Sequence, residues 1–195
     1  MEFQRGFQKL ISVLPKEFTV LDVGSGGLQG ENTTNYLIEH FRSENIMGVC
    51  WADVETKRYL ETREATRMVK IPIFSGNFYK MNFVRQYDLV VLDMNIESNL
   101  EKDWSDEGLA RVRGLVKDGG YLINYIMLTD QYGDPEKTPQ FIRERWKKWW
   151  RTDKLTLKEI GMRLRDIKGW EVFAHDIEER REYILWIMLK KTSGL

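Results

Sequence analysis

Short apolar runs alternate with amphipathic segments along most of this chain, and turn-forming residues bound most of the runs. Apolar runs rich in β-branched and aromatic residues predict strands. Five of them lie at residues 18–23, 46–51, 70–74, 87–93 and 121–127. The fourth, YDLVVLD, is almost unbroken in apolar residues, which is typical of a strand buried on both faces in a parallel sheet.

Helical patterns fill the intervening stretches, at residues 35–41, 54–69, about 99–116 and about 140–168. Two further strands, 170–175 and 182–189, are separated only by the charged segment DIEERR. So short a connection cannot contain a helical crossover, so these two strands should pair antiparallel. We therefore predict an α/β fold with a doubly wound, mostly parallel seven-stranded sheet, an antiparallel last strand, and helices on both faces.

Composition narrows the class of protein. A length of 195 residues predicts a single domain over residues 1–195, and 42% apolar residues exclude a disordered chain. Thirty basic and thirty acidic residues cancel, so a nucleic-acid partner has to be argued from a local patch. The lone Cys50 forms no internal disulfide or zinc cluster, and no apolar run is long enough to span a membrane. We expect a cytoplasmic protein.

Several motifs follow one another in a fixed order: VLDVGSGG at 20–27, the acidic ends of YDLVVLD, the turn KDGG before YLINYIM, and the closing strand pair. In these features the whole chain resembles the class I, Rossmann-like, S-adenosylmethionine-dependent methyltransferases. The resemblance implies that the chain binds S-adenosylmethionine and transfers its methyl group. Glycines after the first strand agree with this, because they let a ligand approach the backbone at the carboxyl edge of the sheet.

The resemblance implies that the turn after the first strand contacts the amino-acid part of the cofactor. The residues concerned are Asp22, Gly24, Ser25, Gly26 and Gly27. The alternative is a plain structural turn. The segment LQGEN lengthens the loop beyond the family pattern, and Gly30 is interpreted as a turn residue.

The cofactor's ribose and adenine have less regular candidates. The family usually places an acid at the end of the second strand, where this chain has Cys50 or Trp51. Asp53 could replace that acid and Trp51 could stack on adenine, or the two could be an ordinary surface acid and a core ring. Asn77 and Phe78 stand where the family has an acid and an aromatic residue, and an amide oxygen can accept the adenine amino hydrogen beside an apolar wall.

Asp93 ends the fourth strand at the same edge of the sheet. A carboxylate there could orient or deprotonate a methyl acceptor, or it could cap the helix expected from about residue 99. The next residues, Met94, Asn95 and Ile96, lack the motif used on exocyclic base amines. Cys50 lies on the wrong strand for the thiol that methylates cytosine carbon. Both kinds of DNA-base methylation are therefore disfavoured.

A narrower comparison concerns the FtsJ-like ribose 2′-O-methyltransferases, which use a Lys-Asp-Lys-Glu tetrad. Lys9, Asp93 and Glu182 resemble three of its members, and Tyr125 stands in place of the second lysine. A tyrosine of ordinary pKa is a poor base for a hydroxyl group. The alternative for Lys9 is a solvated helix residue.

The segment FIRERWKKWWRTDK interleaves cations with tryptophans. Such a face could bind RNA through phosphate contacts and base stacking, by Arg143, Lys147, Lys148, Trp149 and Arg151. The alternative is a helix that packs its tryptophans on the sheet.

Other functions for the whole chain stay open. A non-catalytic protein of this fold could bind RNA or a protein partner. A nicotinamide enzyme is disfavoured because Gly24, Gly26 and Gly30 lack the Gly-x-Gly-x-x-Gly spacing. An aminopropyl transferase has no acidic cluster to support it, and we predict no metal site.

Overall fold

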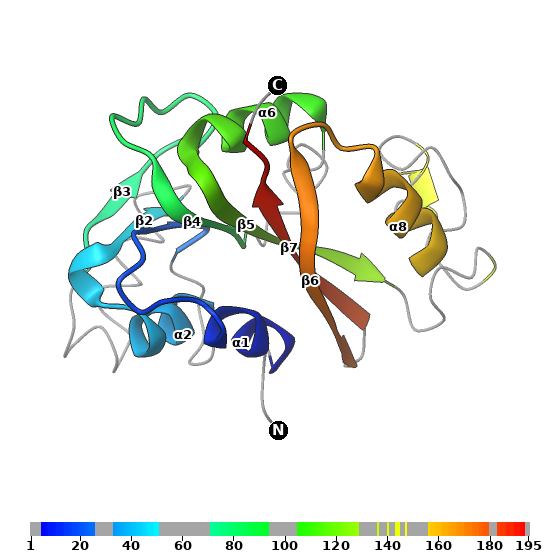
Figure 1. Ribbon diagram of the computed structural model, residues 1–195, viewed down its shortest axis with the longest axis horizontal. Coiled ribbons are helices and arrows are strands. Elements are labelled where there is room, and N and C mark those ends of the chain that lie inside the picture. The colour runs from blue at the N-terminus through cyan, green and yellow to red at the C-terminus, as the bar shows by residue number, and fades with distance from the viewer. Residues whose placement is uncertain are drawn as a thin grey trace.

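Figure 1 shows the computed structural model, which describes residues 5–25, 33–50, 71–93, 105–128, 136, 140, 143–144, 147, 156–179 and 183–193. Its elements are, in chain order, α1 (Arg5–Ser12), β1 (Val20–Val23), α2 (Thr33–His40), the 3-10 turn Ser43–Asn45, β2 (Ile46–Cys50), β3 (Ile73–Ser75), β4 (Tyr87–Leu92), α6 (Asp106–Leu115), β5 (Val116–Leu128), α8 (Leu157–Arg165), β6 (Trp170–Glu179) and β7 (Tyr183–Lys191).

The seven strands form one sheet in the order β3-β2-β1-β4-β5-β7-β6. All pairs from β3 to β5 are parallel. β7 is antiparallel to both of its neighbours, β5 and β6. The predicted mostly parallel sheet with a reversed strand is confirmed.

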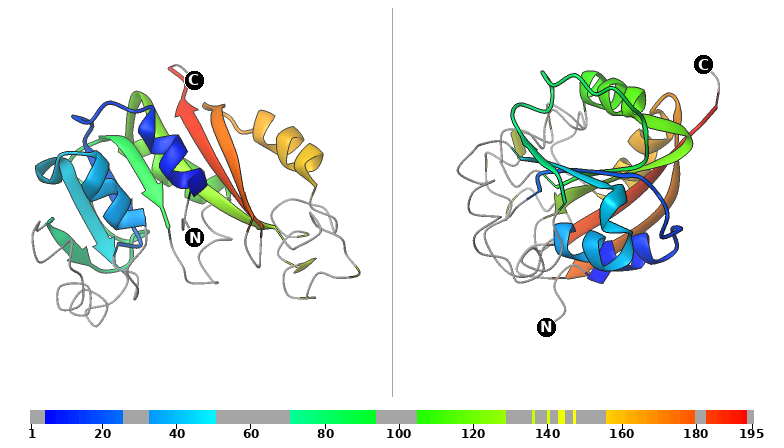
Figure 2. Two further views of the ribbon diagram at one scale, coloured as in Figure 1. Left: turned by 90° about the horizontal axis from the view of Figure 1, so that it is seen from below. Right: turned by 90° about the vertical axis from the view of Figure 1, so that its left-hand side faces the viewer.

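Helices cover both faces of this sheet. Figures 1 and 2 show α1 and α2 on one face and α6 on the other. Alternate residues of each strand enter opposite cores: Val20 and Val91 pack with α1 and α2, whereas Leu21 and Leu92 pack in the core that includes α6 and α8. The fold class predicted from the sequence is therefore correct in both its sheet and its layers.

The predicted turn at 118–120 lies inside β5. Tyr87 pairs with Val116 and Leu89 with Tyr121, so β5 carries extra residues between two consecutive pairs. Gly119 in this bulge has a φ of +75°. A Cβ on Gly120 would lie 2.8 Å from the carbonyl oxygen of Asp88. The two glycines mark a bulge that keeps β5 against β4.

Other boundaries also differ from the prediction. β6 continues through most of the charged segment DIEERR, because Asp176 pairs with Trp186 and Glu179 with Tyr183. The helical pattern at 140–168 is broken at Thr156, which has extended backbone angles and forms a capping box with Glu159. Cross-strand pairing and capping therefore override the local pattern.

Asp88 of β4 binds the residue just before β1 and a residue of β5, at the amino-terminal ends of these strands. Its Oδ2 accepts hydrogen bonds from the Thr19 N–H at 2.8 Å, the Thr19 hydroxyl at 2.6 Å and the Lys117 ammonium at 2.8 Å. Burial alone would raise the pKa of Asp88. The hydrogen bonds and the charge of Lys117 outweigh burial and hold that pKa below its ordinary value. We therefore assign Asp88 a role in stabilising the fold at this edge of the sheet.

Candidate functional site

The site that the topology indicates lies at the carboxyl ends of β1 and β4. The chain leaves β1 for β2 and β3 and returns to β4 on the other side of β1, so the strand order reverses between β1 and β4. Doubly wound sheets bind ligands in the crevice at such a switch point. Asp22 lies in β1, Gly24 and Ser25 follow it, and Asp93 follows β4. The structure therefore brings these predicted residues together.

Backbone hydrogen bonds fix the turn after β1. The N–H groups of Gly24 and Ser25 both donate to the Val49 carbonyl, at 2.8 and 3.0 Å, and the Asp93 N–H donates to the Val23 carbonyl at 2.8 Å. Gly24 has a φ of +98°, a conformation that favours glycine. The turn thus lies against β2, while Asp93 prolongs the contact between β1 and β4.

Gly48 on β2 lets this turn approach the sheet. A Cβ at that position would lie 2.5 Å from the Ser25 hydroxyl oxygen and 3.0 Å from Cγ1 of Ile73. No L side chain fits there without displacing the turn. The sequence analysis missed Gly48, although a glycine inside the apolar run IMGVC is a signal of close backbone approach.

The two carboxylates of the site share the face of the sheet covered by α1 and α2. Asp22 is 0% exposed and Asp93 is 7% exposed. Oδ2 of Asp22 accepts hydrogen bonds from the Ser25 hydroxyl at 2.5 Å and the Thr34 hydroxyl at 2.7 Å. Oδ2 of Asp93 accepts one from the Thr33 hydroxyl at 2.5 Å. Hydroxyl groups on the turn and on α2 therefore hold both carboxylates.

Thr33 and Thr34 are functional candidates that the sequence analysis missed. They lie in the polar segment LQGENTT, for which the sequence predicts only a loop before a helix. In the structure they are the first two residues of α2, and both are buried. The available signal was a pair of hydroxyl residues at a helix start just after a glycine turn.

The alternative role of Asp93, as a cap for the helix expected from about residue 99, stays a prediction, because residues 94–104 lie outside the described residues. Ser105 is the N-cap of α6, and its side chain accepts a hydrogen bond from the Gly108 N–H at 3.0 Å. Asp93 is bound by the Thr33 hydroxyl at the start of α2. Its carboxylate is therefore held at the switch point by a residue of another element.

Several predicted cofactor contacts lie outside the described residues. These are Gly26, Gly27, Trp51 and Asp53. Cys50, at the end of β2, is buried. The ribose acid and the adenine-stacking ring therefore stay predictions.

Asn77 and Phe78 follow β3 as the sequence indicated. The Asn77 Oδ1 accepts the Tyr79 N–H at 3.0 Å, which closes a local turn. Phe78 is 1% exposed and packs against Phe83, with ring centroids 5.8 Å apart. Arg111 from α6 lies over both rings and donates to the Phe78 carbonyl at 3.3 Å. Both residues order this loop, and their contact with adenine stays a prediction.

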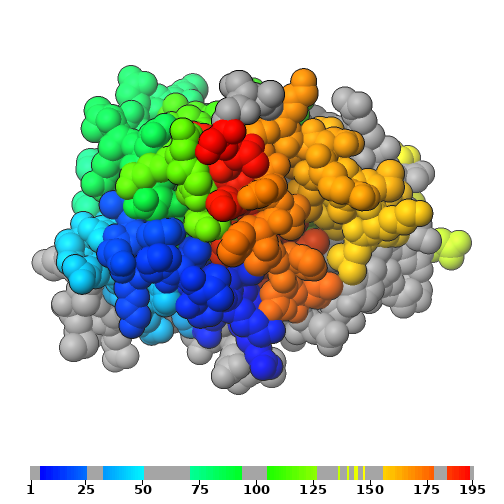
Figure 3. Space-filling view, viewed as in Figure 1, coloured from blue at the N-terminus to red at the C-terminus, as the bar shows by residue number. Residues whose placement is uncertain are grey.

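The members of the predicted tetrad are only partly brought together. Asp93 and Tyr125 each lie two residues beyond the Val91–Ile123 pair, so they occupy corresponding positions on neighbouring strands. Lys9 forms an ion pair with Asp176 of β6, its Nζ 2.6 Å from Oδ2. Figure 3 shows the blue N-terminal helix meeting orange β6 on this face. Glu182 lies outside the described residues.

Tyr125 belongs to an aromatic cluster below α1. Its ring centroid lies 5.0 Å from that of Trp186, which lies 5.0 Å from that of Phe7. Gly6 permits the close crossing of α1, since a Cβ there would be 3.0 Å from the Trp186 ring. Packing therefore fixes the Tyr125 ring.

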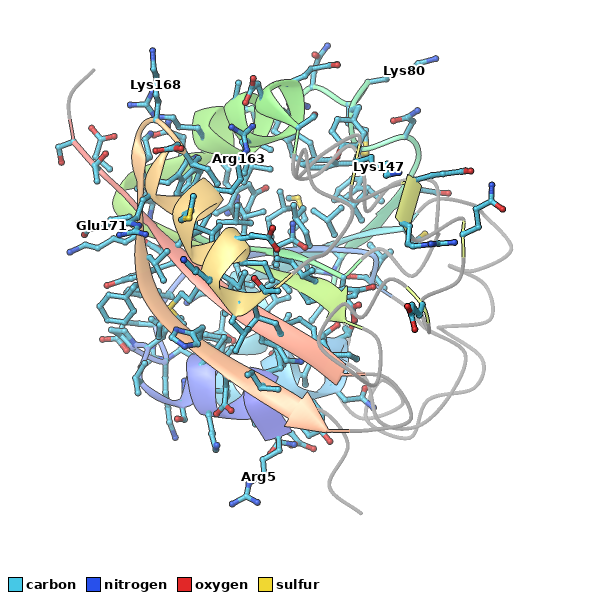
Figure 4. The ribbon with its side chains drawn as sticks, turned by 90° about the vertical axis from the view of Figure 1, so that its right-hand side faces the viewer. Arg5, Lys80, Lys147, Arg163, Lys168 and Glu171 are labelled. Atoms are coloured by element: carbon cyan, nitrogen blue, oxygen red, sulfur yellow. The ribbon has the colours of Figure 1, made fainter. Side chains whose placement is uncertain are left out.

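The basic segment predicted to bind RNA is described only in part. Arg143 and Lys147 are helical, and Lys147 is exposed. Figure 4 labels Lys147 and also Arg163 of α8, whose guanidinium lies 3.6 Å from the Asp106 carboxylate of α6. Outside the described residues are Lys148, Trp149 and Arg151.

In the part of the chain that the structure describes, none of the helices is long and apolar enough to cross a membrane. The His, Cys, Asp and Glu side chains of this same part form no group of three or more that could hold a metal ion.

Comparison with known proteins gives a likeness in structure. No protein-family model and no curated protein sequence matches this chain. A methyltransferase of Methanosarcina mazei is similar, with a TM-score of 0.65, 13% identity and 100% of both chains covered. NodS, an N-methyltransferase of Bradyrhizobium japonicum, gives a TM-score of 0.63 and 10% identity over 96% of this chain and 93% of its own.

A third similar structure is the magnesium protoporphyrin IX methyltransferase of Synechocystis. It gives a TM-score of 0.57 and 13% identity over 95% of this chain and 75% of its own. Identities this low establish the fold. The chain has the fold of the class I S-adenosylmethionine-dependent methyltransferases.

Proposed function

We propose that this protein binds S-adenosylmethionine between the carboxyl ends of β1 and β4 and transfers its methyl group to an acceptor held beside Asp93. The observation that carries the proposal is the meeting of two buried carboxylates and a glycine turn of positive φ at the switch point. Similar structures have been solved with S-adenosyl-L-homocysteine, for NodS, and with S-adenosylmethionine, for the Synechocystis enzyme. These two complexes support the choice of cofactor.

The residues of the turn fit this cofactor. Gly24 gives the turn its left-handed bend, and Gly48 leaves the space in which Ser25 lies. Asp22 is fully buried and bound by two hydroxyls, so its part is to shape the turn that meets the cofactor. When bound, S-adenosylmethionine supplies a methyl group made electrophilic by its sulfonium charge. Gly26 and Gly27 extend the same turn in the sequence.

The remaining cofactor contacts follow from the order of the strands. β2 lies beside β1 and β3 lies beside β2, so residues after these two strands are placed to meet the ribose and the adenine. We assign Asp53 to the ribose hydroxyls, and Trp51, Asn77 and Phe78 to the adenine. The Asn77 Oδ1 already accepts one hydrogen bond, and a carbonyl oxygen can accept a second.

Asp93 is the residue assigned to the acceptor. It is nearly buried, and the Thr33 hydroxyl fixes one of its carboxylate oxygens. A carboxylate held in one orientation can align a proton-bearing acceptor group with the methyl donor, and such alignment contributes strongly to rate. Tyr125 lies next to it on β5 and gives the acceptor a rigid wall.

The first test is calorimetric titration with S-adenosylmethionine, S-adenosyl-L-homocysteine and NADH. We expect the two sulfur compounds to bind and NADH to leave no heat signal. Binding of NADH alone would overturn the cofactor assignment. The second test incubates the protein with tritiated S-adenosylmethionine and separate extracts of RNA, protein and small metabolites. Label in one extract identifies the acceptor class, and an Asp93→Asn protein is the control for enzymatic transfer.

A second candidate function is binding of RNA without methyl transfer. The observation that favours it is the loss of two of the four groups of the ribose-methylating tetrad: Lys9 is paired with Asp176, and Tyr125 replaces a lysine. RNA binding would then use the basic segment around Lys147. Binding of RNA with no label transferred into any extract would support this candidate.

A further inference from the structure

Two adjacent hydroxyl groups at the start of α2 bind two different carboxylates. The Thr33 hydroxyl donates to Asp93 at 2.5 Å, and the Thr34 hydroxyl donates to Asp22 at 2.7 Å. All four residues are buried. The Ser25 hydroxyl also donates to Asp22, at 2.5 Å, so the two carboxylates differ in their hydroxyl donors.

The geometry of a helix start explains this division. Successive residues of a helix point about 100° apart, so two neighbours cannot reach the same group equally. Asp22 lies on β1 and Asp93 just beyond β4, on the same face of the sheet. One helical step therefore separates the donor to one strand from the donor to the other.

We propose that these threonines are two positioning residues with separate tasks, a proposal that rests on the proposed function. Thr34, with Ser25, positions Asp22 and through it the turn that holds the cofactor. Thr33 positions Asp93 and through it the methyl acceptor. The start of α2 thus contacts both the cofactor half and the acceptor half of the site, and a different threonine serves each half.

The hydrogen bonds are strong enough to carry these roles. A hydroxyl that donates to a carboxylate forms a charge-assisted bond, roughly twice as strong as one between neutral groups. When such a donor is removed from a buried carboxylate, the oxygen loses a partner that water does not readily replace. Valine has nearly the shape of threonine without the hydroxyl, and serine keeps the hydroxyl, so the two substitutions separate packing from hydrogen bonding.

The experiment compares Thr34→Val and Thr33→Val with a matched control, Thr19→Val. Thr19 also donates a hydroxyl hydrogen bond to an aspartate, Asp88 at 2.6 Å, but at the opposite edge of the sheet. Titration with S-adenosyl-L-homocysteine measures the cofactor half. The initial rate of tritium transfer into the extract labelled by the wild type measures the acceptor half, and thermal melts check the fold of each variant.

We expect Thr34→Val to weaken S-adenosyl-L-homocysteine binding about tenfold or more, and Thr33→Val and Thr19→Val to change it by less than about twofold. Thr33→Val should slow methyl transfer about tenfold or more at saturating cofactor, because the acceptor is no longer aligned. Thr34→Ser and Thr33→Ser should restore most of each loss.

Equal weakening of S-adenosyl-L-homocysteine binding by Thr33→Val and Thr34→Val would overturn the division of tasks. So would a Thr33→Val protein that transfers methyl groups at the wild-type rate. Failure of the wild type to bind S-adenosyl-L-homocysteine is a different result, which contradicts the proposed function itself. If a valine variant does not fold, the alanine variant of the same threonine replaces it in both measurements, because alanine also lacks the hydroxyl.

Discussion

Hydrogen bonds from a threonine hydroxyl to an aspartate carboxylate occur at both edges of the sheet, and we infer a different role for them at each edge. At the amino-terminal edge, Thr19 donates to Asp88 and the Lys117 ammonium adds a charged donor. At the carboxyl edge, the hydroxyls of Ser25 and Thr34 donate to Asp22, and the hydroxyl of Thr33 donates to Asp93. The Asp88 carboxylate, paired with the Lys117 ammonium, stabilises the contact between β4 and β5. The hydroxyls at the carboxyl edge instead hold two buried carboxylates in fixed positions at the proposed site.

The comparison predicts the largest effect at Asp93. Asp93→Asn should slow methyl transfer about 100-fold or more, the usual loss for an acid, base or orienting group in a reaction. Affinity for S-adenosyl-L-homocysteine should stay within a few-fold of wild type, as titration would show. A variant with full transfer activity would remove Asp93 from the reaction.

The next effect concerns the space beside Ser25. Gly48→Ala should weaken S-adenosyl-L-homocysteine binding about tenfold or more, because the added Cβ forces the turn away from β2. Gly161→Ala is the matched control: a Cβ on that residue of α8 meets nothing within 4 Å. Titration of both variants measures the difference. If Gly48→Ala binds as tightly as Gly161→Ala, the cofactor does not depend on this turn.

Asp88 should matter for stability and not for binding. Asp88→Asn should lower the free energy of unfolding at pH 7 by about 1–3 kcal/mol, since hydrogen bonds to a charged group are lost. Because its folded pKa is lowered, the carboxylate stabilises the fold fully above its unfolded pKa of about 3.9 and loses that effect as pH falls through the folded value.

Urea unfolding of Asp88→Asn and wild type at pH 7 and near pH 3 would measure this pH dependence. The two curves should converge at the lower pH. S-adenosyl-L-homocysteine affinity should match wild type at pH 7. If the difference in free energy of unfolding between wild type and Asp88→Asn grew toward acid pH, the charged Asp88 carboxylate would not be what stabilises the fold.

The smallest effect is expected at the basic segment. If Lys147 contacts RNA phosphate, Lys147→Glu should reduce the slope of log affinity against log salt by about 0.7 to 1. Lys16→Glu is the control, because it makes the same charge change at an exposed residue between α1 and β1. Filter binding of bulk RNA across a salt series gives both slopes. Equal slopes for the two variants would exclude Lys147 from the contact.

How much of this could be predicted from the sequence depends on the range of the interactions. YDLVVLD specifies both a buried strand and an acid at each end, so Asp88 and Asp93 were both visible, though only Asp93 was singled out. The hydrogen-bond partners of these two acids could not be predicted from the sequence. The Thr33–Asp93 bond joins residues 60 apart in the chain, and the Thr19–Asp88 bond joins residues 69 apart. No local pattern contains either bond.

The bulge in β5 and the length of β6 were missed for a related reason. Asp176 has low strand propensity, yet its pairing with Trp186 places it in β6. The glycines of KDGG signal an irregularity, but only the register with Tyr87 and Leu89 shows that the irregularity lies within a strand. Pairing across the sheet decides such boundaries.

The reversed strand β7 has a consequence for how the chain is made. β6 precedes β7 in the chain, yet among the described strands it pairs only with β7, which lies between it and β5. On the ribosome β6 therefore emerges before the strand that attaches it to the sheet, and the edge of β5 stays open until β7 has emerged. An open edge is a site of mispairing between chains. Mispairing between chains is therefore expected at the edge of β5 in any form of the chain in which β7 has not yet paired with it.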